Sequence, residues 1–299
     1  MPSGRILVSG ASGLIGRALV SSLQADGYEV VRLVRSANPA PTQIPWDPAQ
    51  PLSPQSVSGF DAVVHLAGES IAGRWTPTRM RNILNSRADG TRHLCEALAA
   101  AAQPPRVLVS ASAVGYYGTR GDEFLSEESS AGTGFATEIC LAWEAATRPA
   151  AAAGIRVAQM RIGLVLSAQG GALPKMLPAF RTGIGGNMGN GRQWWSWIDL
   201  RDLVNAIRFT LQNDSLRGPV NAVSPNPVTN AQFTKTLAAA VHRPALLPMP
   251  VFAVRLAFGQ MGVELMLASQ RVQPNKLLAA GFTFQHPELR AALQEMLKK

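Results

Sequence analysis

The sequence predicts an α/β protein in which a parallel β-sheet is covered by helices on both faces. Through the first half of the chain, short runs of β-branched and aliphatic residues alternate with longer amphipathic segments, a rhythm typical of strands joined by crossover helices. A glycine-rich junction at residues 10–16 joins the first such run to the first amphipathic segment. A chain of 299 residues is long enough for one large domain with a small additional lobe.

The position of each expected element follows from its residues. Strands are expected where short, mostly β-branched runs occur, at residues 6–8, 30–34, 62–66, 106–110, 156–161 and 219–223. Helices are expected where apolar residues recur every three or four positions, at residues 14–24, 77–102, 135–153 and 199–212. A further helix is expected to begin at residues 229–232, where Thr and Gln have the spacing of a capping box.

The rhythm changes after residue 163. Residues 168–196 are rich in glycine and are expected to be loop-like. Residues 243–299 are expected to be mostly helical, with prolines as punctuation. We therefore expect a sheet-containing domain over residues 1–240, with the insertion at 168–196, and a small helical C-terminal lobe over residues 241–299.

Composition and charge narrow the class of protein. The chain has 28 Lys and Arg against 19 Asp and Glu, but the basic residues form no tract, so we expect no nucleic-acid partner. An arginine-rich helical stretch at residues 74–92 is either a solvated face or partly a site for an anionic ligand. No apolar run approaches the ~18–20 residues of a membrane-spanning helix, and no leader-like segment opens the chain, so we expect no membrane partner and a cytoplasmic protein. Cys95 and Cys140 lack metal-ligand spacing, and the four histidines are scattered, so no metal site is expected. His65, at a strand end, is interpreted as a structural histidine.

Residues 10–16 read Gly-Ala-Ser-Gly-Leu-Ile-Gly, with glycine at the first, fourth and seventh positions. Gly10 allows a sharp turn, Gly13 allows backbone amides to approach a pyrophosphate, and Gly16 allows close packing of helix on strand. The helix that follows presents its positive N-terminal end to the same place. This context predicts a Rossmann-type, doubly wound dinucleotide site, with Ser12, Leu14 and Ile15 completing the loop. A bare tight turn is the competing interpretation.

The end of the second strand bears on which dinucleotide binds. An NAD site commonly has an acidic residue there, about 20 residues after the glycines, to bind the ribose 2′-hydroxyl. Here the sequence has Arg32, Arg35 and Ser36 and no acid. Guanidinium groups and a hydroxyl complement a 2′-phosphate, so we expect NADP(H) as the cofactor. Alternatively, both arginines are simply solvated.

Three segments together resemble the extended short-chain dehydrogenase/reductase superfamily: residues 10–16, 61–68 and 109–118. More narrowly, nearly the whole chain resembles an atypical bacterial epimerase-like family that ends in a short domain of unknown function. That resemblance rests on residues 112–118, Cys140, Trp143, Glu144 and residues 170–173, 196–199, 226–230 and 270–274.

The resemblance implies a bound NADP(H) in the domain at residues 1–240 and a substrate lobe at 241–299. It places Asp47 near the adenine amino group and residues 161–164 beside the nicotinamide half. The full set of cofactor contacts implied beyond the glycine loop is Leu66, Ala67, Gly68, Ser110, Arg161 and Gly163. A small-molecule substrate is also expected. The oligomeric state stays open, with a homodimer as one option, because helix faces that pair subunits in relatives cannot be told from core faces in the sequence.

The chain departs from the superfamily in its catalytic residues. Proton transfer there uses a serine or threonine with Tyr-x-x-x-Lys, but the tyrosines here are Tyr28, Tyr116 and Tyr117, and none has lysine four residues later. Ser112 stands in the serine position. Glu138, Tyr116 and Tyr117 are candidates for the acid/base. Each has a structural alternative: a strand-end serine, a helix-start carboxylate and packing tyrosines.

Two classes of function therefore stay open. One is an oxidoreductase or epimerase-like enzyme on a small carbonyl or hydroxyl substrate, with Ser112 orienting the substrate oxygen. The other is a non-catalytic NADP(H) sensor, consistent with the missing Tyr-Lys pair. A tryptophan-rich run at residues 194–197 is either an aromatic wall for the substrate or part of the core.

Overall fold

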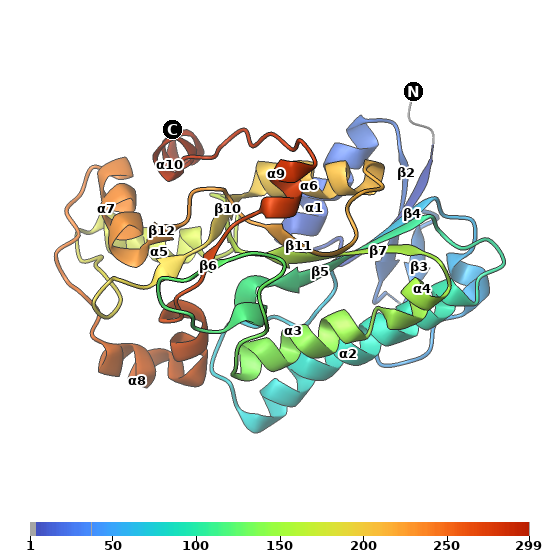
Figure 1. The fold of residues 1–299 in the computed structure, drawn as a ribbon, viewed down its shortest axis with the longest axis horizontal. Coiled ribbons are helices and arrows are strands. Elements are labelled where there is room, and N and C mark those ends of the chain that lie inside the picture. The colour runs from blue at the N-terminus through green and yellow to red at the C-terminus, as the bar shows by residue number, and fades with distance from the viewer. Residues whose placement is uncertain (1–3, 37, 299) are drawn as a thin grey trace.

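A computed structural model describes residues 4–36 and 38–298. Its centre is a seven-stranded parallel sheet with the order β11-β7-β5-β4-β1-β2-β3 (Figure 1). The strands are β1 (Arg5–Ser9), β2 (Glu29–Val34), β3 (Gln43–Pro45), β4 (Ala62–His65), β5 (Val107–Ala113), β7 (Arg156–Ile162) and β11 (Gly218–Ala222). The chain moves outward from β1 to β3, then returns to β4 and moves outward in the other direction. This reversal confirms the doubly wound prediction and creates a switch point between β1 and β4, where α/β proteins bind ligands.

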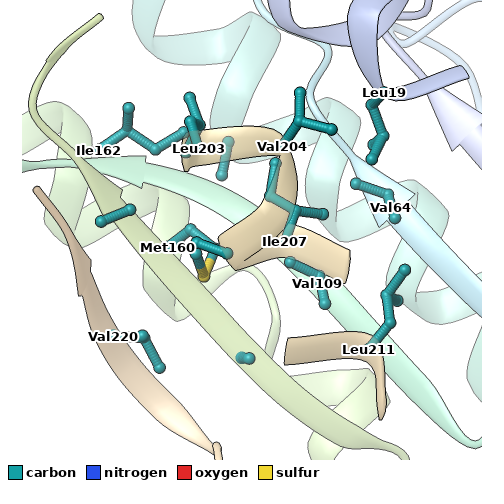
Figure 2. Close-up of a cluster of buried hydrophobic side chains, with 14 of the residues drawn as sticks. Leu19, Val64, Val109, Met160, Ile162, Leu203, Val204, Ile207, Leu211 and Val220 are labelled. Carbon is teal, nitrogen blue, oxygen red and sulfur yellow. The ribbon is translucent and has the colours of Figure 1, made fainter. Parts of the chain in front are cut away.

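Helices cover both faces of this sheet. On one face lie α1 (Leu14–Ala25) and α6 (Leu200–Gln212), and on the other lie α2 (Pro77–Ala99), α3 (Phe135–Ala145) and α4 (Arg148–Ala152) (Figure 1). Because both faces of the sheet are buried, the central strands direct apolar side chains toward both faces. Figure 2 shows the first face, where Leu19 of α1 and the α6 residues Leu203, Val204, Ile207 and Leu211 pack on Val64, Val109 and Met160 of the strands.

Two predicted segments differ from the structure. The expected helix at residues 135–153 is two helices, because Pro149 has no N–H with which to continue α3 and instead occupies the first turn of α4. The expected loop at 168–196 contains helix α5 (Leu173–Arg181), so that prediction was wrong there. Glycines flank α5 on both sides and obscured its short apolar stripe, Leu173, Leu177 and Phe180.

Smaller elements complete the chain. Four short elements are helical turns: η1 (Pro54–Val57), η2 (Val114–Tyr117), the π-helical η3 (Gly262–Met266) and the five-residue α9 (Asn275–Ala279). The remaining strands form two-residue or three-residue pairs: β6 (Phe124–Leu125) with β13 (Arg271–Val272), β8 (Leu164–Leu166) with β10 (Trp197–Asp199), and β9 (Trp194–Trp195) with β12 (Val228–Thr229). Helix α7 (Asn230–Ala240) begins with the predicted capping box between Thr229 and Gln232.

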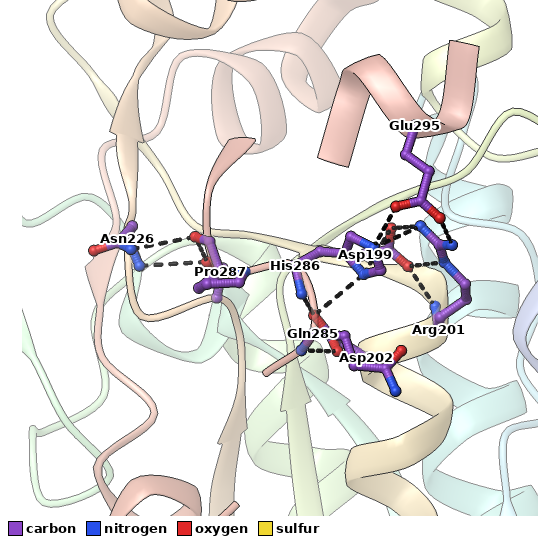
Figure 3. Close-up of polar contacts among 9 residues, drawn as sticks. Asp199, Arg201, Asp202, Asn226, Gln285, His286, Pro287 and Glu295 are labelled. Atoms are coloured by element: carbon purple, nitrogen blue, oxygen red, sulfur yellow. Dashed lines mark hydrogen bonds and ion pairs between the residues drawn. The ribbon is translucent and has the colours of Figure 1, made fainter. Parts of the chain in front are cut away.

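The C-terminal segment carries α8 (Val251–Met261), α9 and α10 (Leu289–Leu297), the last packed on α7. Figure 3 shows how its tail is fixed to α6. The backbone N–H groups of Gln285 and His286 each donate 2.8 Å hydrogen bonds to the Asp202 carboxylate, and Glu295 contacts the His286 ring. Asn226 also donates to the Pro287 carbonyl and Arg201 to the His286 ring, so several polar contacts hold the tail in place. Residues 1–3 and 299, at the ends of the predicted domains 1–240 and 241–299, lie outside the described residues, and that division stays a prediction.

Candidate functional site

The glycine loop lies at the switch point, between the end of β1 and the start of α1. Gly10 has φ +69°, and a Cβ atom there would lie 2.6 Å from the carbonyl carbon of Leu66. A Cβ atom on Gly16 would lie 2.2 Å from the Gly10 carbonyl oxygen. Both positions therefore require glycine for reasons of packing alone.

Gly13 has a different environment. A Cβ atom there would meet only the Gly10 carbonyl oxygen, at 3.3 Å, and the residue is exposed at the start of α1. No side chain caps the first turn of α1, and no acidic residue occupies it. The positive end of the helix thus faces open space, as an anion site requires.

A cavity of about 330 Å³ lies in front of this loop. One wall is the glycine loop itself, including Leu14 and Ile15, together with Leu66 from the end of β4. The opposite wall comes from the turn into β8 and the segment before α5: Gly163, Leu164, Val165, Gly171 and Ala172. The cavity thus joins the predicted pyrophosphate loop to the predicted nicotinamide side. Ser12 lies exposed at its edge.

The end of β2 carries the residues expected to choose between NAD and NADP. Arg32 is half-buried, and its Nε has no hydrogen-bond partner among the described residues. Arg35 and Ser36 are exposed directly after the strand. Asp47, after β3, is exposed and accepts a 3.0 Å hydrogen bond from the backbone of Ala49. Among the described residues, this edge therefore offers two arginines, Arg32 and Arg35, that form no ion pair.

A buried polar chain positions the loop after β4. The Ser9 hydroxyl accepts hydrogen bonds from the backbone N–H groups of Leu66 and Ala67, at 3.1 and 3.3 Å. The same hydroxyl contacts His65 Nδ1 at 2.6 Å, and His65 Nε2 contacts Thr91 Oγ at 2.9 Å. Burial lowers the pKa of His65 to about 4, so the ring is neutral in the folded protein. His65 is thus a structural residue, as predicted, and it fixes part of the cavity wall.

Arg87 was not singled out by sequence reasoning. It lies on α2, is buried, and donates hydrogen bonds to the carbonyl oxygens of Glu69 and Ile83, at 3.0 and 3.2 Å. Its guanidinium group lies 4.8 Å from the Trp143 ring, and a Cβ atom on Gly68 would come within 3.1 Å of it. The Arg87 guanidinium therefore packs directly against the backbone of Gly68. The only available signal was its place in the arginine-rich stretch at residues 74–92.

A charged cluster lies at the carboxyl ends of β5 and β7. The Ser112 hydroxyl donates a 2.8 Å hydrogen bond to Glu144 Oε1 of α3. Arg161 pairs with both oxygens of that carboxylate, through Nε at 2.8 Å and Nη2 at 2.9 Å. The Arg161 side chain is only 3% exposed and that of Glu144 is 12% exposed. Ser112 is therefore held in one orientation by a buried ion pair, and Glu144 is the acidic residue of the cluster.

The two adjacent tyrosines have opposite environments. Tyr117 is fully buried, donates to Asn221 Oδ1 at 2.7 Å and accepts from Arg161 Nη1 at 3.0 Å. Burial raises the pKa of Tyr117 to about 12, and both hydrogen bonds are made within the protein. Tyr116 is half-buried, and its ring lies 3.4 Å from the Arg161 guanidinium carbon. Only Tyr116 thus combines exposure with an adjacent positive charge.

Several other predicted residues lie away from this arrangement. Glu138 is exposed on α3, so it lacks the burial on which its candidacy as the acid/base depended, and its role stays a prediction. Ser110 is fully buried within β5. Cys140 is also buried, and burial raises its pKa to about 11, which keeps it a thiol at neutral pH. Sequence reasoning singled out Glu138 because it begins a helix where the superfamily has its Tyr-x-x-x-Lys motif, whereas the spacing that places Glu144 beside Ser112 is set by the fold.

The tryptophan run resolves mostly into core. Trp197 is fully buried and Trp195 is buried, both among the apolar side chains of α5 and α7. Trp194 is half-buried, with the Arg271 guanidinium 4.0 Å from its ring and Asp122 accepting from its indole N–H at 2.7 Å. An aromatic wall of three tryptophans is therefore excluded.

The described residues include neither a membrane-spanning helix nor a group of metal ligands. No helix over residues 4–36 and 38–298 is long and apolar enough to cross a membrane. Within the same ranges no three His, Cys, Asp or Glu side chains are grouped as metal ligands.

Comparison with known proteins identifies the family of this chain. The profile of the NAD dependent epimerase/dehydratase family matches residues 6–222, and that of a domain of unknown function, DUF1731, matches residues 249–296. Epimerase family protein Mb2239 of Mycobacterium bovis is 43% identical over 295 residues, covering 98% of this chain and 97% of that protein.

Two solved structures extend the comparison. The human epimerase family protein SDR39U1, crystallised with NADPH, superposes with a TM-score of 0.88 at 37% identity and covers 98% of both chains. A nucleoside-diphosphate sugar epimerase from Corynebacterium glutamicum has a TM-score of 0.83 at 38% identity, over 99% of this chain and 58% of that one. These matches confirm the resemblance seen in the sequence. The chain belongs to the NAD dependent epimerase/dehydratase family.

Proposed function

We propose that this protein is an NADP(H)-dependent oxidoreductase or epimerase-like enzyme that acts on a small carbonyl or hydroxyl substrate in the cytoplasm. The observation that carries the proposal is the buried Arg161, which holds Glu144 against Ser112 and stacks on Tyr116. Buried ion pairs are costly to desolvate and add little net stability. A charged cluster at the carboxyl ends of two central strands is therefore better explained by function.

The described residues fit a dinucleotide phosphate. The uncapped start of α1 and the open side of Gly13 suit a pyrophosphate. Arg35, Ser36 and the unpaired Nε of Arg32 suit a ribose 2′-phosphate, and NADPH is present in the human relative. Leu66, Ala67 and Gly163 would line the cofactor. When bound, the nicotinamide exchanges a hydride with the substrate carbon.

Ser112 would orient the substrate oxygen. Its proton is donated to Glu144, so the lone pairs of its oxygen are left to accept a hydrogen bond from a substrate hydroxyl. This arrangement fits the carbinol form of a substrate better than the carbonyl form. Arg161 holds the Glu144 carboxylate in place through two hydrogen bonds, and both act as positioning residues for Ser112.

Tyr116 would transfer the proton. In the superfamily a lysine beside the catalytic tyrosine stabilises the negative charge of its phenolate. Here the Arg161 guanidinium carbon lies 3.4 Å from the centre of the Tyr116 ring and places positive charge beside it. Arg161 would therefore stabilise the phenolate, as the lysine does in the superfamily. The exposed Glu138 and the fully bonded Tyr117 are not part of this proposal.

The test is NADPH oxidation over a panel of aldehydes, quinones and nucleotide sugars, followed by variants. Tyr116→Phe is expected to lower kcat by about 10²–10⁴-fold, the usual contribution of acid/base catalysis, with NADPH affinity unchanged. Ser112→Ala is expected to lower kcat/KM through loss of substrate orientation. Glu138→Gln is the matched control and should keep full activity. Full activity in Tyr116→Phe would overturn the assignment of the proton donor.

A second candidate function is supported by the same cluster. The Ser112 hydroxyl already donates its proton to Glu144, and the segment around the buried Cys140 contains no lysine that could assist proton transfer. Both features also suit a protein that binds NADP(H) without turnover. Such a sensor would bind NADPH tightly, give no oxidation with any member of the panel, and change its protease sensitivity between NADPH and NADP⁺. Turnover with any substrate would exclude it.

A further inference from the structure

Two long stretches of the sequence have no acidic residue. The sequence has no Asp or Glu between Glu144 and Asp199, and none between Asp214 and Glu264. Much of these stretches forms α5, α7, α8 and their connecting loops, at the end of the molecule farthest from β2 and β3 (Figure 1). The exposed basic residues of this end are Lys175, Arg181, Arg192, Lys235, Arg243 and Arg255.

Exposed apolar side chains gather at the same end. Among the described residues, the large apolar side chains with high exposure are Phe124, Leu141, Ile184, Leu246, Leu247, Val251, Phe252, Leu256 and Leu278. Six of these nine lie in residues 184–256. Leu256 is 81% exposed and Phe252 is 72% exposed, which is unusual for side chains of this size.

These side chains come from neighbouring segments. The backbone N–H of Leu247 donates to the Gly185 carbonyl at 3.3 Å, and that of Met249 donates to the Asn187 carbonyl at 2.8 Å. The loop after α5 therefore lies alongside the segment that leads into α8. On α8 itself, Val254 and Met261 are buried, while Phe252 and Leu256, four residues apart, share an exposed side. We call the six apolar residues, together with Arg181, Lys235, Arg243 and Arg255, the basic apolar face.

The charge of this face selects its partner. A symmetric dimer through it would bring like charges together, because an isologous interface pairs the same patch from each copy. Arg243 donates to the carbonyl oxygens of Arg181 and His242, so its charge meets no carboxylate there. Five of the six apolar side chains are aliphatic and offer no ring on which a nucleic-acid base could stack. A partner with an anionic surface and an apolar interior complements both the basic residues and the exposed aliphatic side chains.

We propose that the basic apolar face docks the protein on the surface of an anionic lipid bilayer. Phe252, Leu256 and Leu247 would enter the boundary between headgroups and acyl chains, and Arg243, Arg255 and Lys235 would contact the anionic headgroups. Stable peripheral binding generally needs two such signals, and this face supplies both. The proposal revises the expectation of no membrane partner, which rested on the lack of a spanning segment.

The test is co-sedimentation of the full chain with vesicles of phosphatidylcholine alone, and with vesicles of phosphatidylcholine and phosphatidylglycerol. Binding is expected only to the second, and is expected to weaken as salt is added. Arg255→Glu should weaken it by at least about fivefold, the effect of one basic residue at such a surface. The double variant Phe252→Ser/Leu256→Ser should weaken it by at least about tenfold, because two apolar side chains no longer enter the bilayer.

Matched controls lie elsewhere on the surface. Leu278→Ser removes an exposed leucine of α9, and Arg290→Glu reverses an exposed charge of α10; both should leave vesicle binding unchanged. NADPH affinity is measured for every variant as a check on folding. The proposal is overturned if the protein does not sediment with anionic vesicles, or if it binds both kinds equally. It is also overturned if the wild type instead forms a dimer that Phe252→Ser/Leu256→Ser dissociates.

Discussion

Two walls of the candidate site are built in different ways. The first, which we call the backbone wall, is the glycine loop after β1, with Gly10, Gly13 and Gly16 in seven consecutive residues and an uncapped helix start. The second, which we call the charged wall, is the cluster at the ends of β5 and β7, whose bonds join residues 17 and 32 positions apart, Arg161 and Ser112 to Glu144. The backbone wall is thus specified by a local pattern, whereas the charged wall exists only after the sheet has formed.

The largest expected effect is on the backbone wall. Gly13→Val places a branched side chain in the cavity, where the pyrophosphate must approach, and should abolish NADPH binding. The fold should persist, since the nearest contact of the new Cβ is the Gly10 carbonyl oxygen at 3.3 Å. Fluorescence titration and circular dichroism on one sample measure both properties.

Gly16→Val is the contrasting variant. Its Cβ would lie 2.2 Å from the same carbonyl oxygen, so it should lose the fold together with the binding. If Gly13→Val still binds NADPH with wild-type affinity, the glycine loop is only a turn and the comparison of the two walls fails.

The next largest effect is on the charged wall. Arg161→Met leaves Glu144 buried without its partner, which should lower the free energy of unfolding by about 3–5 kcal/mol. The double variant Arg161→Met/Glu144→Met removes both charges and should be destabilised by less than the single variant. Denaturant unfolding measures both. A double variant that is as unstable as the single one would show that packing, and not charge, dominates this wall.

These differences explain what the sequence could predict. The glycine loop and the parallel sheet were predicted because each depends on neighbours in the chain, whereas the role of Arg32 and Arg35 at the end of β2 stays a prediction. Arg161 was predicted at the site, but as a cofactor contact and not as the partner of Glu144. Glu144 itself was quoted only as part of a resemblance, because nothing local marks which carboxylate of α3 faces β5.

The helices show the same limit. Pro149 and its effect on the expected helix at 135–153 were visible in the sequence, since proline cannot continue a helix. Helix α5 was missed because its glycine-rich flanks matched a loop. Arg87 was not predicted because its role depends on the approach of Gly68, on another element, to within contact distance.

A smaller effect concerns the junction between the walls, where His65 holds Ser9 and Thr91 together. The pKa of His65 is about 4 in the folded protein, against 6.5 when unfolded. The unfolded chain therefore binds the proton first as pH falls, and stability that is complete above pH 6.5 is lost between 6.5 and 4. The loss should total about 3 kcal/mol, from 1.36 kcal/mol per pKa unit.

Urea unfolding across this pH range measures that loss. His242→Asn, which changes an exposed histidine, should keep the wild-type pH dependence. His65→Gln should be less stable at pH 7 but should lose less on acidification. An equal loss in His65→Gln and the wild type would assign the pH dependence to other groups.

The smallest expected effect distinguishes NADPH from NADH at the outer end of the backbone wall. Arg35 is exposed after β2, where no acidic residue would repel a 2′-phosphate. One charge-assisted hydrogen bond to that phosphate contributes about 1.5–3 kcal/mol, so Arg35→Ala should weaken NADPH binding by about tenfold or more. NADH, which has no 2′-phosphate, should bind Arg35→Ala and the wild type equally.

Arg290→Ala, which removes an exposed arginine of α10, is the control for a general loss of positive charge and should change neither affinity. Titration of each protein with both nucleotides gives the ratio directly. If NADPH and NADH bind the wild type equally, Arg32 and Arg35 are simply solvated, and other residues determine the preference between the two cofactors.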